Sequence, residues 1–234
     1  MSKYKCLLWD LDDTLFDFKK CEHDGIAESF RKHGKSVSED VISLYSKIND
    51  SYWKRLEKQE ITRQEVLVGR FRSLFEALLY RDMDAADFQN TYHVELGKQA
   101  VLMDGAWEVL SVCKDMGLYN YVVTNGVAQT QRNRMRLSHL DELVNGVFIS
   151  EELEAEKPST VFFAKALQVI QKDHPSITKD HILVVGDSLT SDMLGGCQSG
   201  LDVCWFNVRK KENDLALPLN YEIYHLLDII AILV

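Results

Sequence analysis

Three aspartates stand directly behind an apolar run near the start of the chain, in the stretch YKCLLWDLDDTLFDF at residues 4–18. Asp10, Asp12 and Asp13 follow a segment that predicts a buried strand. Carboxylates repel one another, so three within four residues are costly unless a ligand uses them. Asp10 and Asp12 are two residues apart, and this spacing places both side chains on one side of an extended strand. Asp13 is interpreted as a turn residue that caps a helix or faces water.

Other polar clusters end later apolar runs or lie in loops. TNG at residues 124–126 and GDSLTSD at residues 186–192 each end a predicted strand, and AEKPS at residues 155–159 lies in a loop. In an open parallel sheet, ligands bind at the carboxyl ends of the strands. Carboxylates can hold a hard cation, while a hydroxyl, amides and an ammonium group can bind phosphate oxygens. The residues expected to meet in one crevice are Asp10, Asp12, Thr124, Asn125, Lys157, Asp187 and Asp192.

Each of these residues also has a purely structural interpretation. Thr124 alone would more often be an ordinary strand-end hydroxyl, and Lys157 alone a solvated lysine. Asp192 is about equally well explained as a cap of the helical segment DMLGGCQSG. The functional interpretation is favoured for Asp10 and Asp12, because the other clusters occur where the chemistry needs them.

Short apolar runs alternate with helical patterns over much of the chain. The runs that predict strands buried on both faces are YKCLLW, YNYVVT, GVFIS, HILVVG and LDVCWF. Between them, residues 105–118 have a helical stripe that ends at Gly117 and comprises Val109, Leu110, Cys113 and Met116. A second helix is expected to open at Ser159, with a stripe of Val161, Phe162, Ala166 and Val169. Strands alternating with helices predict an α/β fold, a doubly wound (Rossmann-like) parallel sheet.

The region 17–98 has a different pattern of apolar and charged residues. It contains no proline and almost no strand-like runs, and period-3.6 patterns dominate it. One predicted apolar helix face comprises Leu67, Phe71, Leu74, Phe75 and Leu78. The sequence therefore predicts an α/β catalytic core at residues 1–16 and 99–234, with an inserted all-helical cap domain at residues 17–98.

Composition and charge narrow the class of protein. Of the 234 residues, 46% are hydrophobic and 27% are charged, which is typical of a globular protein with a substantial core. The net charge of −9 disfavours binding to nucleic acid. A small phosphorylated ligand could still bind, because a metal ion can supply positive charge locally. Five cysteines without a C-x-x-C pair indicate reduced thiols and a cytoplasmic location. The apolar segment LLDIIAILV at residues 226–234 is too short to span a membrane and is interpreted as a last helix on the core. No metal-ligand spacing is found at His23, His33, His93 and His139, and no chemistry is assigned to them.

The ordered motifs resemble those of the haloacid dehalogenase superfamily. They are D-x-D-x-T at residues 10–14, Thr124 after an apolar strand, Lys157 before a proline, and G-D-x-x-x-x-D at residues 186–192. The helical insertion after the first motif matches the C1 cap of that superfamily. Any one motif would be weak, but four in order and at strand ends are highly specific, and the resemblance covers essentially the whole chain.

The resemblance implies a role for each site residue. Asp10 would be the nucleophile that forms an aspartyl-phosphate, and Asp12 the general acid and base. Thr124, Asn125 and Lys157 would bind the phosphoryl group. Mg²⁺ would be held by the Asp10 and Asp187 carboxylates and the backbone carbonyl of Asp12, and Asp192 would orient Lys157 or a metal-bound water.

The resemblance also points to a substrate class. Asp12 argues for phosphoryl transfer, because dehalogenating relatives do without the second aspartate. The cap sequence and the tail GGxxxGxxxxWFN are similar to pyrimidine 5'-nucleotidases, which implies a nucleoside monophosphate as substrate. AEKPS departs from that branch, which more often has an aromatic residue or glycine before the lysine and aspartate after the proline. Trp53 in the insertion is interpreted as cap core, with a substrate platform as the alternative.

Several alternatives stay open. A phosphatase for a sugar phosphate or phosphoglycolate would carry the same motifs, and so would a mutase of the β-phosphoglucomutase type. A non-catalytic phosphate-binding relative is disfavoured because both Asp10 and Asp12 are present. No membrane partner is expected, and the protein is expected to be a monomer or a small homo-oligomer.

Overall fold

The chain divides into two compact units in a computed structural model that describes residues 3–234. The first, here called the sheet unit, comprises the described residues up to Asp17, then Val101–Ala128 and Met135–Val234. The second, here called the helical unit, comprises Phe18–Ala100 together with Gln129–Arg134. The short segment from the later part of the chain was not foreseen as part of the helical unit, because it belongs to a helix that starts in the sheet unit.

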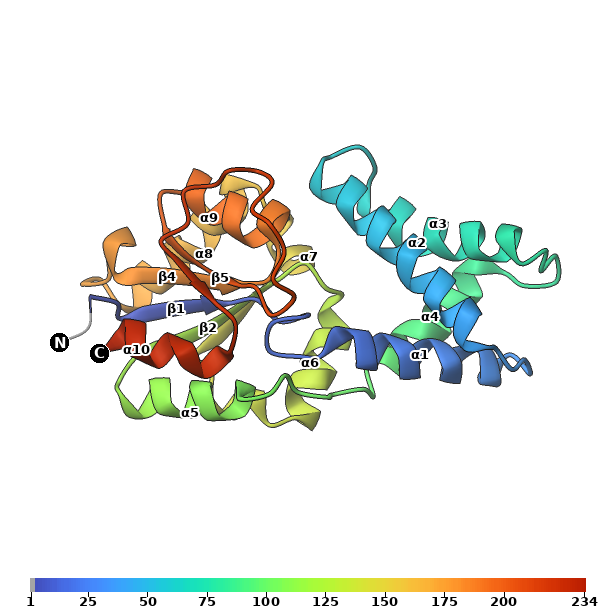
Figure 1. Cartoon of the computed structure of the whole chain (residues 1–234), viewed down its shortest axis with the longest axis horizontal. Coiled ribbons are helices and arrows are strands. Elements are labelled where there is room, and N and C mark those ends of the chain that lie inside the picture. The colour runs from blue at the N-terminus through green and yellow to red at the C-terminus, as the bar shows by residue number, and fades with distance from the viewer. Residues whose placement is uncertain (1–2) are drawn as a thin grey trace. The chain divides into compact units, whose positions relative to one another are not determined.

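The sheet unit is built on six parallel strands in the order β3-β2-β1-β4-β5-β6 (Figure 1). This order reverses direction at β1, as in a doubly wound sheet, and it confirms the predicted α/β fold. The strands are β1 (Cys6–Trp9), β2 (Tyr119–Thr124), β3 (Gly146–Ile149), β4 (Ile182–Gly186), β5 (Asp202–Phe206) and β6 (Tyr221–Ile223). The five predicted runs form the first five of these strands.

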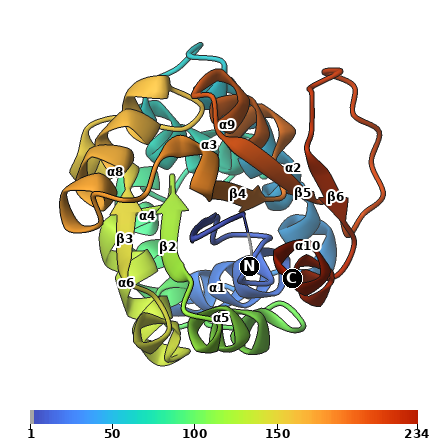
Figure 2. The same cartoon turned by 90° about the vertical axis from the view of Figure 1, so that its left-hand side faces the viewer.

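Helices cover both faces of this sheet (Figure 2). On one face, α8 and α9 pack against alternate strand residues such as Leu8, Val123 and Val184, which are buried with Phe162 and Phe163 of α8. The side chains in between, such as those of Leu7 and Trp9, point to the opposite face, where α5 and α10 lie. The helical segments of this unit are α5 (Ala106–Asp115), α6 (Ala128–Leu137), η1 (Leu140–Glu142), α7 (Ser150–Leu153), α8 (Thr160–Asp173), η2 (Lys179–His181), η3 (Leu189–Met193), α9 (Leu194–Gln198), η4 (Leu226–Ile229) and α10 (Ile230–Leu233).

The predicted helix ends are largely confirmed, but two buried faces differ from the prediction. Ser159 caps α8 by accepting a hydrogen bond from Val161 N (3.2 Å), and Gly117 follows α5 with a positive φ of 75°. In α8, however, Val161 and Val169 are exposed, and the buried face comprises Phe162, Phe163, Ala166, Leu167 and Ile170. Met116 after α5 is exposed as well. In α8 the stripe that contains both phenylalanines faces the sheet, so the neighbouring valines face outward.

Besides the Gln129–Arg134 segment of α6, the described part of the helical unit comprises α1 (Phe18–Lys32), α2 (Glu39–Glu57), α3 (Arg63–Ala77) and α4 (Ala85–Leu96) (Figure 1). The start of α3 is fixed by a capping box, in which Thr62 and Glu65 exchange side-chain and backbone hydrogen bonds. Asp84 caps α4 through the backbone amides of Ala86 and Asp87. These two caps set where α3 and α4 begin.

One part of the helical unit has an aromatic core. The Tyr45 and Phe71 rings stack at 5.2 Å between centroids, and Phe88 contacts both Phe30 and Phe71 at 4.7 and 5.0 Å. The predicted face of α3 is confirmed at Phe71, Leu74 and Phe75, which are buried. It is wrong at its ends, because Leu67 and Leu78 are only half-buried, whereas Val66 and the charged Arg70 are buried.

Another part of the helical unit buries a polar network. Asn49 Nδ2 donates to Glu22 Oε1 (2.8 Å), and Arg70 donates to Asn49 Oδ1 (2.6 Å) and to Gln89 Oε1 (2.9 Å). The Gln89 amide nitrogen in turn donates to His93 Nε2. Because this amide nitrogen is only a donor, His93 must present an unprotonated Nε2. Burial and the nearby guanidinium groups of Arg70 and Arg63 lower the pKa of His93 to about 4.

The His93 environment predicts a loss of stability in mild acid. An unfolded histidine takes up its proton near its ordinary pKa of about 6.5, whereas folded His93 does so only near 4. The free energy of unfolding should therefore fall as pH decreases from about 6.5 to 4, by about 1–2 kcal/mol for this half-buried group. Urea unfolding of the wild type and His93→Gln across this range checks it. Parallel pH profiles for the two proteins would contradict the assignment to His93.

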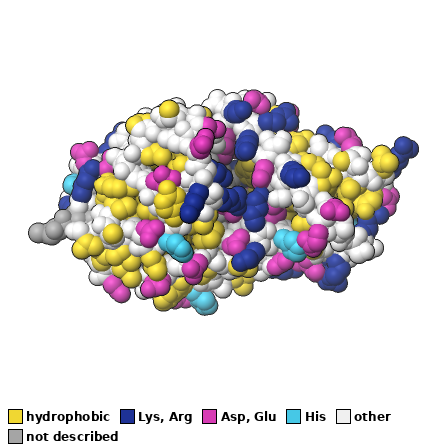
Figure 3. All heavy atoms as spheres, in the orientation of Figure 1, with side chains coloured by type: hydrophobic (Ala, Val, Ile, Leu, Met, Phe, Trp, Pro, Cys, Tyr) yellow, Lys and Arg dark blue, Asp and Glu magenta, His cyan; other side chains and the backbone are white. Residues whose placement is uncertain are grey.

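No helix in the described part of the chain is long and apolar enough to cross a membrane. The five cysteines, Cys6, Cys21, Cys113, Cys197 and Cys204, are free thiols, in agreement with the expected absence of disulfides. Both acidic and basic side chains are exposed on the face drawn in Figure 3.

Candidate active site

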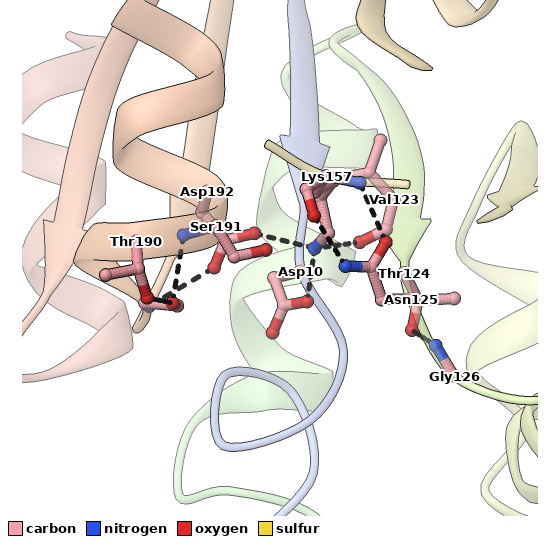
Figure 4. A network of polar contacts seen from close by, with 10 residues as sticks. Asp10, Val123, Thr124, Asn125, Gly126, Lys157, Thr190, Ser191 and Asp192 are labelled. Atoms are coloured by element: carbon pink, nitrogen blue, oxygen red, sulfur yellow. Dashed lines mark hydrogen bonds and ion pairs between the residues drawn. The ribbon is translucent and has the colours of Figure 1, made fainter. Parts of the chain in front are cut away.

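Lys157 is the centre of a buried ion-pair network in the sheet unit (Figure 4). Its side chain is 2% exposed, and Nζ donates to Asp10 Oδ1 (2.7 Å), Asp192 Oδ1 (2.6 Å) and the carbonyl of Val123 (2.8 Å). An ammonium group has three hydrogens, so each has an acceptor. Three separate stretches of the chain are thus tied to one cation.

The sheet brings these groups together at its switch point. Asp10 directly follows the central strand β1, and its backbone amide donates to Val185 O on β4 (2.8 Å). Val123 lies on β2, which pairs with β1 on the other side. Since the strands are parallel, their carboxyl ends meet at one edge, which is where ligands bind in such sheets.

Asp192 supports Lys157 from a helical turn. It lies within η3, and Ser188, not Asp192, is the capping residue whose Oγ accepts from Ser191 N (3.1 Å). Asp192 Oδ2 accepts from the Ser188 amide (3.2 Å), while Oδ1 accepts from Lys157. Its two oxygens therefore hold the start of the turn and the lysine at once, so Asp192 contacts Lys157 as one interpretation predicted, whereas it does not cap the helical segment that follows it.

Asp187 completes a group of carboxylates that could hold a metal ion. Asp10, Asp187 and Asp192 each offer an oxygen within 4.8 Å of the other two. The backbone carbonyl of Asp187 accepts a hydrogen bond from Trp205 Nε1 on β5 (2.9 Å), which fixes the peptide that carries this carboxylate. Because both oxygens of Asp192 already accept hydrogen bonds, Asp10 and Asp187 are the carboxylates better suited to bind a cation.

The carboxylates of this group lie close together although they repel one another, and their pKa values reflect this. Burial, together with the charge of Asp192, raises the pKa of Asp10 to about 7, although Lys157 opposes this shift. Burial also raises the pKa of Asp187, and the nearby Asp13, Asp10 and Asp192 carboxylates add to it. Burial alone would lower the pKa of Lys157, but the carboxylates of Asp10 and Asp192 outweigh it and raise that pKa. A pocket with excess negative charge suits a hard cation.

The end of β2 lies beside Lys157. Thr124 is 2% exposed, and its hydroxyl accepts a hydrogen bond from Gly126 N (3.0 Å). The Asn125 side chain exchanges two hydrogen bonds of 2.9 Å with the backbone N and O of Lys157. The Asn125 side chain thus positions the lysine loop, and phosphate binding at Asn125 stays a prediction.

The loop after β1 turns back on itself within a few residues. Asp12 and Phe16 form a bridge, and Asp13 N donates to Phe16 O (2.9 Å). Asp13 has a left-handed φ of 62°, which aspartate tolerates better than most residues. Its carboxylate pairs with Arg209 Nη2 at 3.2 Å, after β5. The interpretation of Asp13 as a turn residue is confirmed, but it pairs with a cation instead of only facing water.

Two residues that support the carboxylate group were not predicted from the sequence. Trp205 was noted only as part of a tail pattern, yet its indole holds the Asp187 peptide. Gly186 was noted only as part of a motif, yet a Cβ there would lie 2.3 Å from Asp192 Oδ2. The glycine directly before Asp187 was the available signal, because a strand glycine often marks a close approach by another group.

Gly186→Ala is expected to displace the Asp192 carboxylate. The added methyl group has no room because Asp192 is 1% exposed and hydrogen-bonded at both oxygens. We expect a loss of about 1–3 kcal/mol in the free energy of unfolding, measured in urea, and a fall in catalytic activity. Gly146→Ala on β3 is the control, since its Cβ would approach only the Tyr121 ring at 3.1 Å. Equal effects of the two changes would contradict the assigned contact.

A family model described as haloacid dehalogenase-like hydrolase matches residues 4–200. The chain belongs to this family of hydrolases. The matched range contains the D-x-D-x-T motif at residues 10–14, Thr124, Lys157 and both later aspartates. The family resemblance of the sequence is thereby confirmed.

Similar members of the family include proteins named for phosphate chemistry. The chain is 34% identical to the HAD-hydrolase YfnB of Bacillus subtilis, covering 98% of this chain and 97% of that protein. The crystal structure of YfnB bound to magnesium superposes with a TM-score of 0.90, at 33% identity and 98% coverage of each chain. Pyrimidine 5'-nucleotidase PynA of Streptococcus pneumoniae is 33% identical over 97% of this chain and 94% of its own. Pyrimidine 5'-nucleotidase YjjG of Escherichia coli is 26% identical over 90% and 89%.

Proposed function

We propose that this hydrolase is a Mg²⁺-dependent phosphomonoesterase that acts through an aspartyl-phosphate on Asp10, with pyrimidine nucleoside monophosphates as substrates. The observation that carries the proposal is the placement of Lys157 between Asp10 and Asp192, with Asp187 in the same carboxylate group. A buried lysine that is paired with a carboxylate at the switch point of a sheet is suited to bind a second anion there.

The residues present fit a magnesium ion. Asp10 and Asp187 supply hard oxygen donors within 4.8 Å, and burial together with the neighbouring carboxylates raises the pKa of each, a cost of the charged form that a bound cation would offset. Asp10, Asp187 and the backbone carbonyl of Asp12 would hold the ion. When bound, Mg²⁺ supplies positive charge next to the phosphoryl oxygens.

In the proposed reaction, the Asp10 carboxylate attacks phosphorus and the bond to the ester oxygen breaks. Lys157 holds the attacking carboxylate in place and offsets the repulsion between two anions. The hydrogen bond that Lys157 Nζ donates to Asp192 Oδ1 and the Asn125 contacts to the lysine backbone keep Nζ fixed during this step. The preorganised ammonium group then requires little rearrangement at the transition state.

Asp12 is proposed to move the protons. It would give a proton to the leaving oxygen, and as a carboxylate it would then take one from the water that attacks the phosphoryl group and releases Asp10. Its place two residues after Asp10, in the turn bridged to Phe16, keeps it close to the nucleophile in the chain. Thr124 is proposed to donate its hydroxyl proton to a phosphoryl oxygen.

The substrate proposal rests on the relatives. PynA and YjjG are both named pyrimidine 5'-nucleotidases, and PynA matches nearly the full length of this chain at 33% identity.

Phosphate release from a panel of monophosphates tests both halves of the proposal. The panel holds dUMP, dTMP, UMP, AMP, glucose 6-phosphate, β-glucose 1-phosphate and phosphoglycolate. We expect turnover to be concentrated on the pyrimidine nucleotides, to be lost with EDTA and to return with added Mg²⁺. Preference for a sugar phosphate or phosphoglycolate would overturn the substrate, and turnover that persists in EDTA would overturn the metal.

A further inference from the structure

A groove on the sheet unit has no part in the proposed reaction. It is lined by α8, by Lys179 of η2 and by the end of α9, and its volume is about 780 Å³. We call it the α8 groove. None of the described residues that line it belongs to the network of Figure 4. Cavities of this size hold small organic ligands.

The side chains that line the α8 groove give it a positive charge. Lys172 and Lys179 are exposed there, and none of the described lining residues is acidic. This local charge contrasts with the net charge of −9 of the whole chain. Ammonium groups with hydroxyls and amides beside them suit the oxygens of a phosphate group. The lining residues that carry a hydroxyl or an amide are Thr160, Gln168, Gln171, Gln198 and Ser199.

Along α8 the groove is apolar at one end and cationic at the other. Val161 and Ala164 line it near the start of α8, whereas Lys172 lies in the last turn. A helix rises about 1.5 Å per residue, so the stretch from Val161 to Lys172 spans about 16 Å. An extended nucleoside triphosphate has this polarity and this length, with a flat ring at one end and phosphates at the other.

Backbone contacts hold two of the polar side chains in place. Lys179 Nζ donates to Ser199 O (2.8 Å) and makes no other hydrogen bond within the described part of the chain. An ammonium group has three hydrogens, so two remain for a ligand. Gln171 Nε2 donates to Ile177 O (3.2 Å), which fixes the amide at the cationic end of the groove. Less side-chain freedom is lost when such fixed groups bind a ligand.

Ser199 supplies a second observation that points to a ligand. It is only 8% exposed, and its hydroxyl has no hydrogen-bond partner among residues 3–234. Buried hydroxyls are nearly always paired, and a helical serine commonly bonds a carbonyl of the preceding turn. Here the carbonyls of Gly195 and Gly196 accept from the Ser199 amide instead. A ligand in the α8 groove would supply the partner that this hydroxyl lacks.

The groove joins the two segments that hold the catalytic lysine. α8 begins three residues after Lys157, and α9 directly follows η3, which contains Asp192. The two segments touch, since a Cβ on Gly195 would lie 2.5 Å from Phe163 and 3.0 Å from Pro158 Cα. Packed interiors transmit displacements, so a ligand that bridges α8 and α9 constrains both partners of the Lys157–Asp192 ion pair.

We propose that the α8 groove is a regulatory site that binds a nucleoside triphosphate. Lys172 and Lys179 bind the phosphates, while the glutamine amides and Val161 contact the sugar and the base. By holding α8 against α9, the ligand fixes the Lys157–Asp192 ion pair and raises kcat. The site goes beyond the proposed function, because it concerns a second ligand that binds away from Asp10.

Titration with ATP, followed by calorimetry in EDTA, tests the site. Without a metal ion the carboxylate group repels ATP, so binding in the groove is measured. We expect one ATP per chain with a Kd below about 1 mM. The Lys172→Gln, Lys179→Gln double variant should bind at least about 10-fold more weakly.

The matched control is the Lys5→Gln, Lys114→Gln double variant. It removes the same charge from the sheet unit outside the groove, and Lys114, like Lys179, donates to a backbone carbonyl (Glu142 O, 2.8 Å). Its Kd for ATP should stay within about 2-fold of the wild type. If the Lys172→Gln, Lys179→Gln protein does not fold, Gln168→Glu places a repelling charge in the groove and is held to the same comparison.

The outcomes separate binding from regulation. No ATP binding to the wild type, or equal weakening in both double variants, overturns the site. Inorganic triphosphate that binds as tightly as ATP overturns the role of the amides and Val161. With p-nitrophenyl phosphate and Mg²⁺, ATP should raise wild-type kcat at least about 2-fold and leave the Lys172→Gln, Lys179→Gln variant unchanged.

An increase in KM alone would show competition at the active site and would overturn regulation through the groove. A wild type that does not hydrolyse p-nitrophenyl phosphate overturns the proposed function and the regulatory role with it. The titration result stands in that case, since it does not depend on turnover.

Discussion

Asp10→Asn should lower phosphate release by at least about 10⁴-fold while the protein stays folded. An amide cannot attack phosphorus, and no other carboxylate accepts the hydrogen bond that Lys157 gives to Asp10. The change removes a carboxylate whose pKa burial and Asp192 raise to about 7. At pH 8 and in EDTA, the free energy of unfolding should therefore rise by about 1–3 kcal/mol, because the unfavourable buried charge is gone.

Asp13→Asn is the matched control for this change. Asn tolerates the left-handed φ of 62° as well as Asp does, and the substitution removes the ion pair with Arg209 and a charge that helps raise the pKa of Asp187. Such a pair is worth at most about 1 kcal/mol, so activity should stay within about 5-fold of the wild type. Substantial turnover by Asp10→Asn, or an equal collapse in Asp13→Asn, would contradict the assignment of the nucleophile.

Lys157→Met should lose both activity and stability. Removing the ammonium group leaves Asp10 and Asp192, 7% and 1% exposed, without their shared cation. Breaking a buried ion pair costs about 3–5 kcal/mol, partly relieved here if Asp10 takes up a proton. Phosphate release should fall at least about 10²-fold, because the repulsion between nucleophile and phosphate is no longer offset. Urea unfolding and kinetics on one preparation measure both effects.

Two further variants show which property of Lys157 matters. Lys157→Arg keeps the charge, but its planar guanidinium does not fit three acceptors arranged around one ammonium, so it should be more stable than Lys157→Met yet still impaired. Lys165→Met on α8 removes a lysine that donates only to the Leu153 carbonyl and should leave activity unchanged. A Lys157→Met protein with wild-type stability would show that the network of Figure 4 does not hold the site together.

The sheet could be predicted from the sequence because its strands are buried on both faces. Runs such as HILVVG admit only one interpretation, and the polar residues that follow them fall at the carboxyl ends of β1, β2 and β4. The strand β6, with only Tyr221–Ile223, was missed because it is short and carries a charged residue at its centre. Lys157, Asp10 and Asp192 were expected together on the basis of the motif order, and the structure places them within hydrogen-bonding distance.

Supporting contacts could not be predicted because they join residues that are remote in sequence and ordinary in type. Asn125 bonds the backbone of a residue in another loop, and Trp205 bonds a peptide on the neighbouring strand. In the helical unit, the buried Arg70 interrupts the apolar stripe, so the period-3.6 pattern favoured Leu67 instead. Charged residues are normally assigned to solvent, and only the partners supplied by α2 and α4 make Arg70 an interior residue.

The most direct test of the proposed chemistry is to locate the phosphoryl group during turnover. Asp12→Asn, which lacks the proposed general base, is mixed with p-nitrophenyl phosphate and Mg²⁺, quenched in acid and mapped by peptide mass spectrometry. We predict a phosphoryl group on Asp10, absent when EDTA is present and absent from the Asp10→Asn, Asp12→Asn double variant. Phosphorylation of another residue, or steady release of phosphate by the wild type with no phosphorylated Asp10 in any quenched sample, would contradict the central claim that Asp10 is the nucleophile.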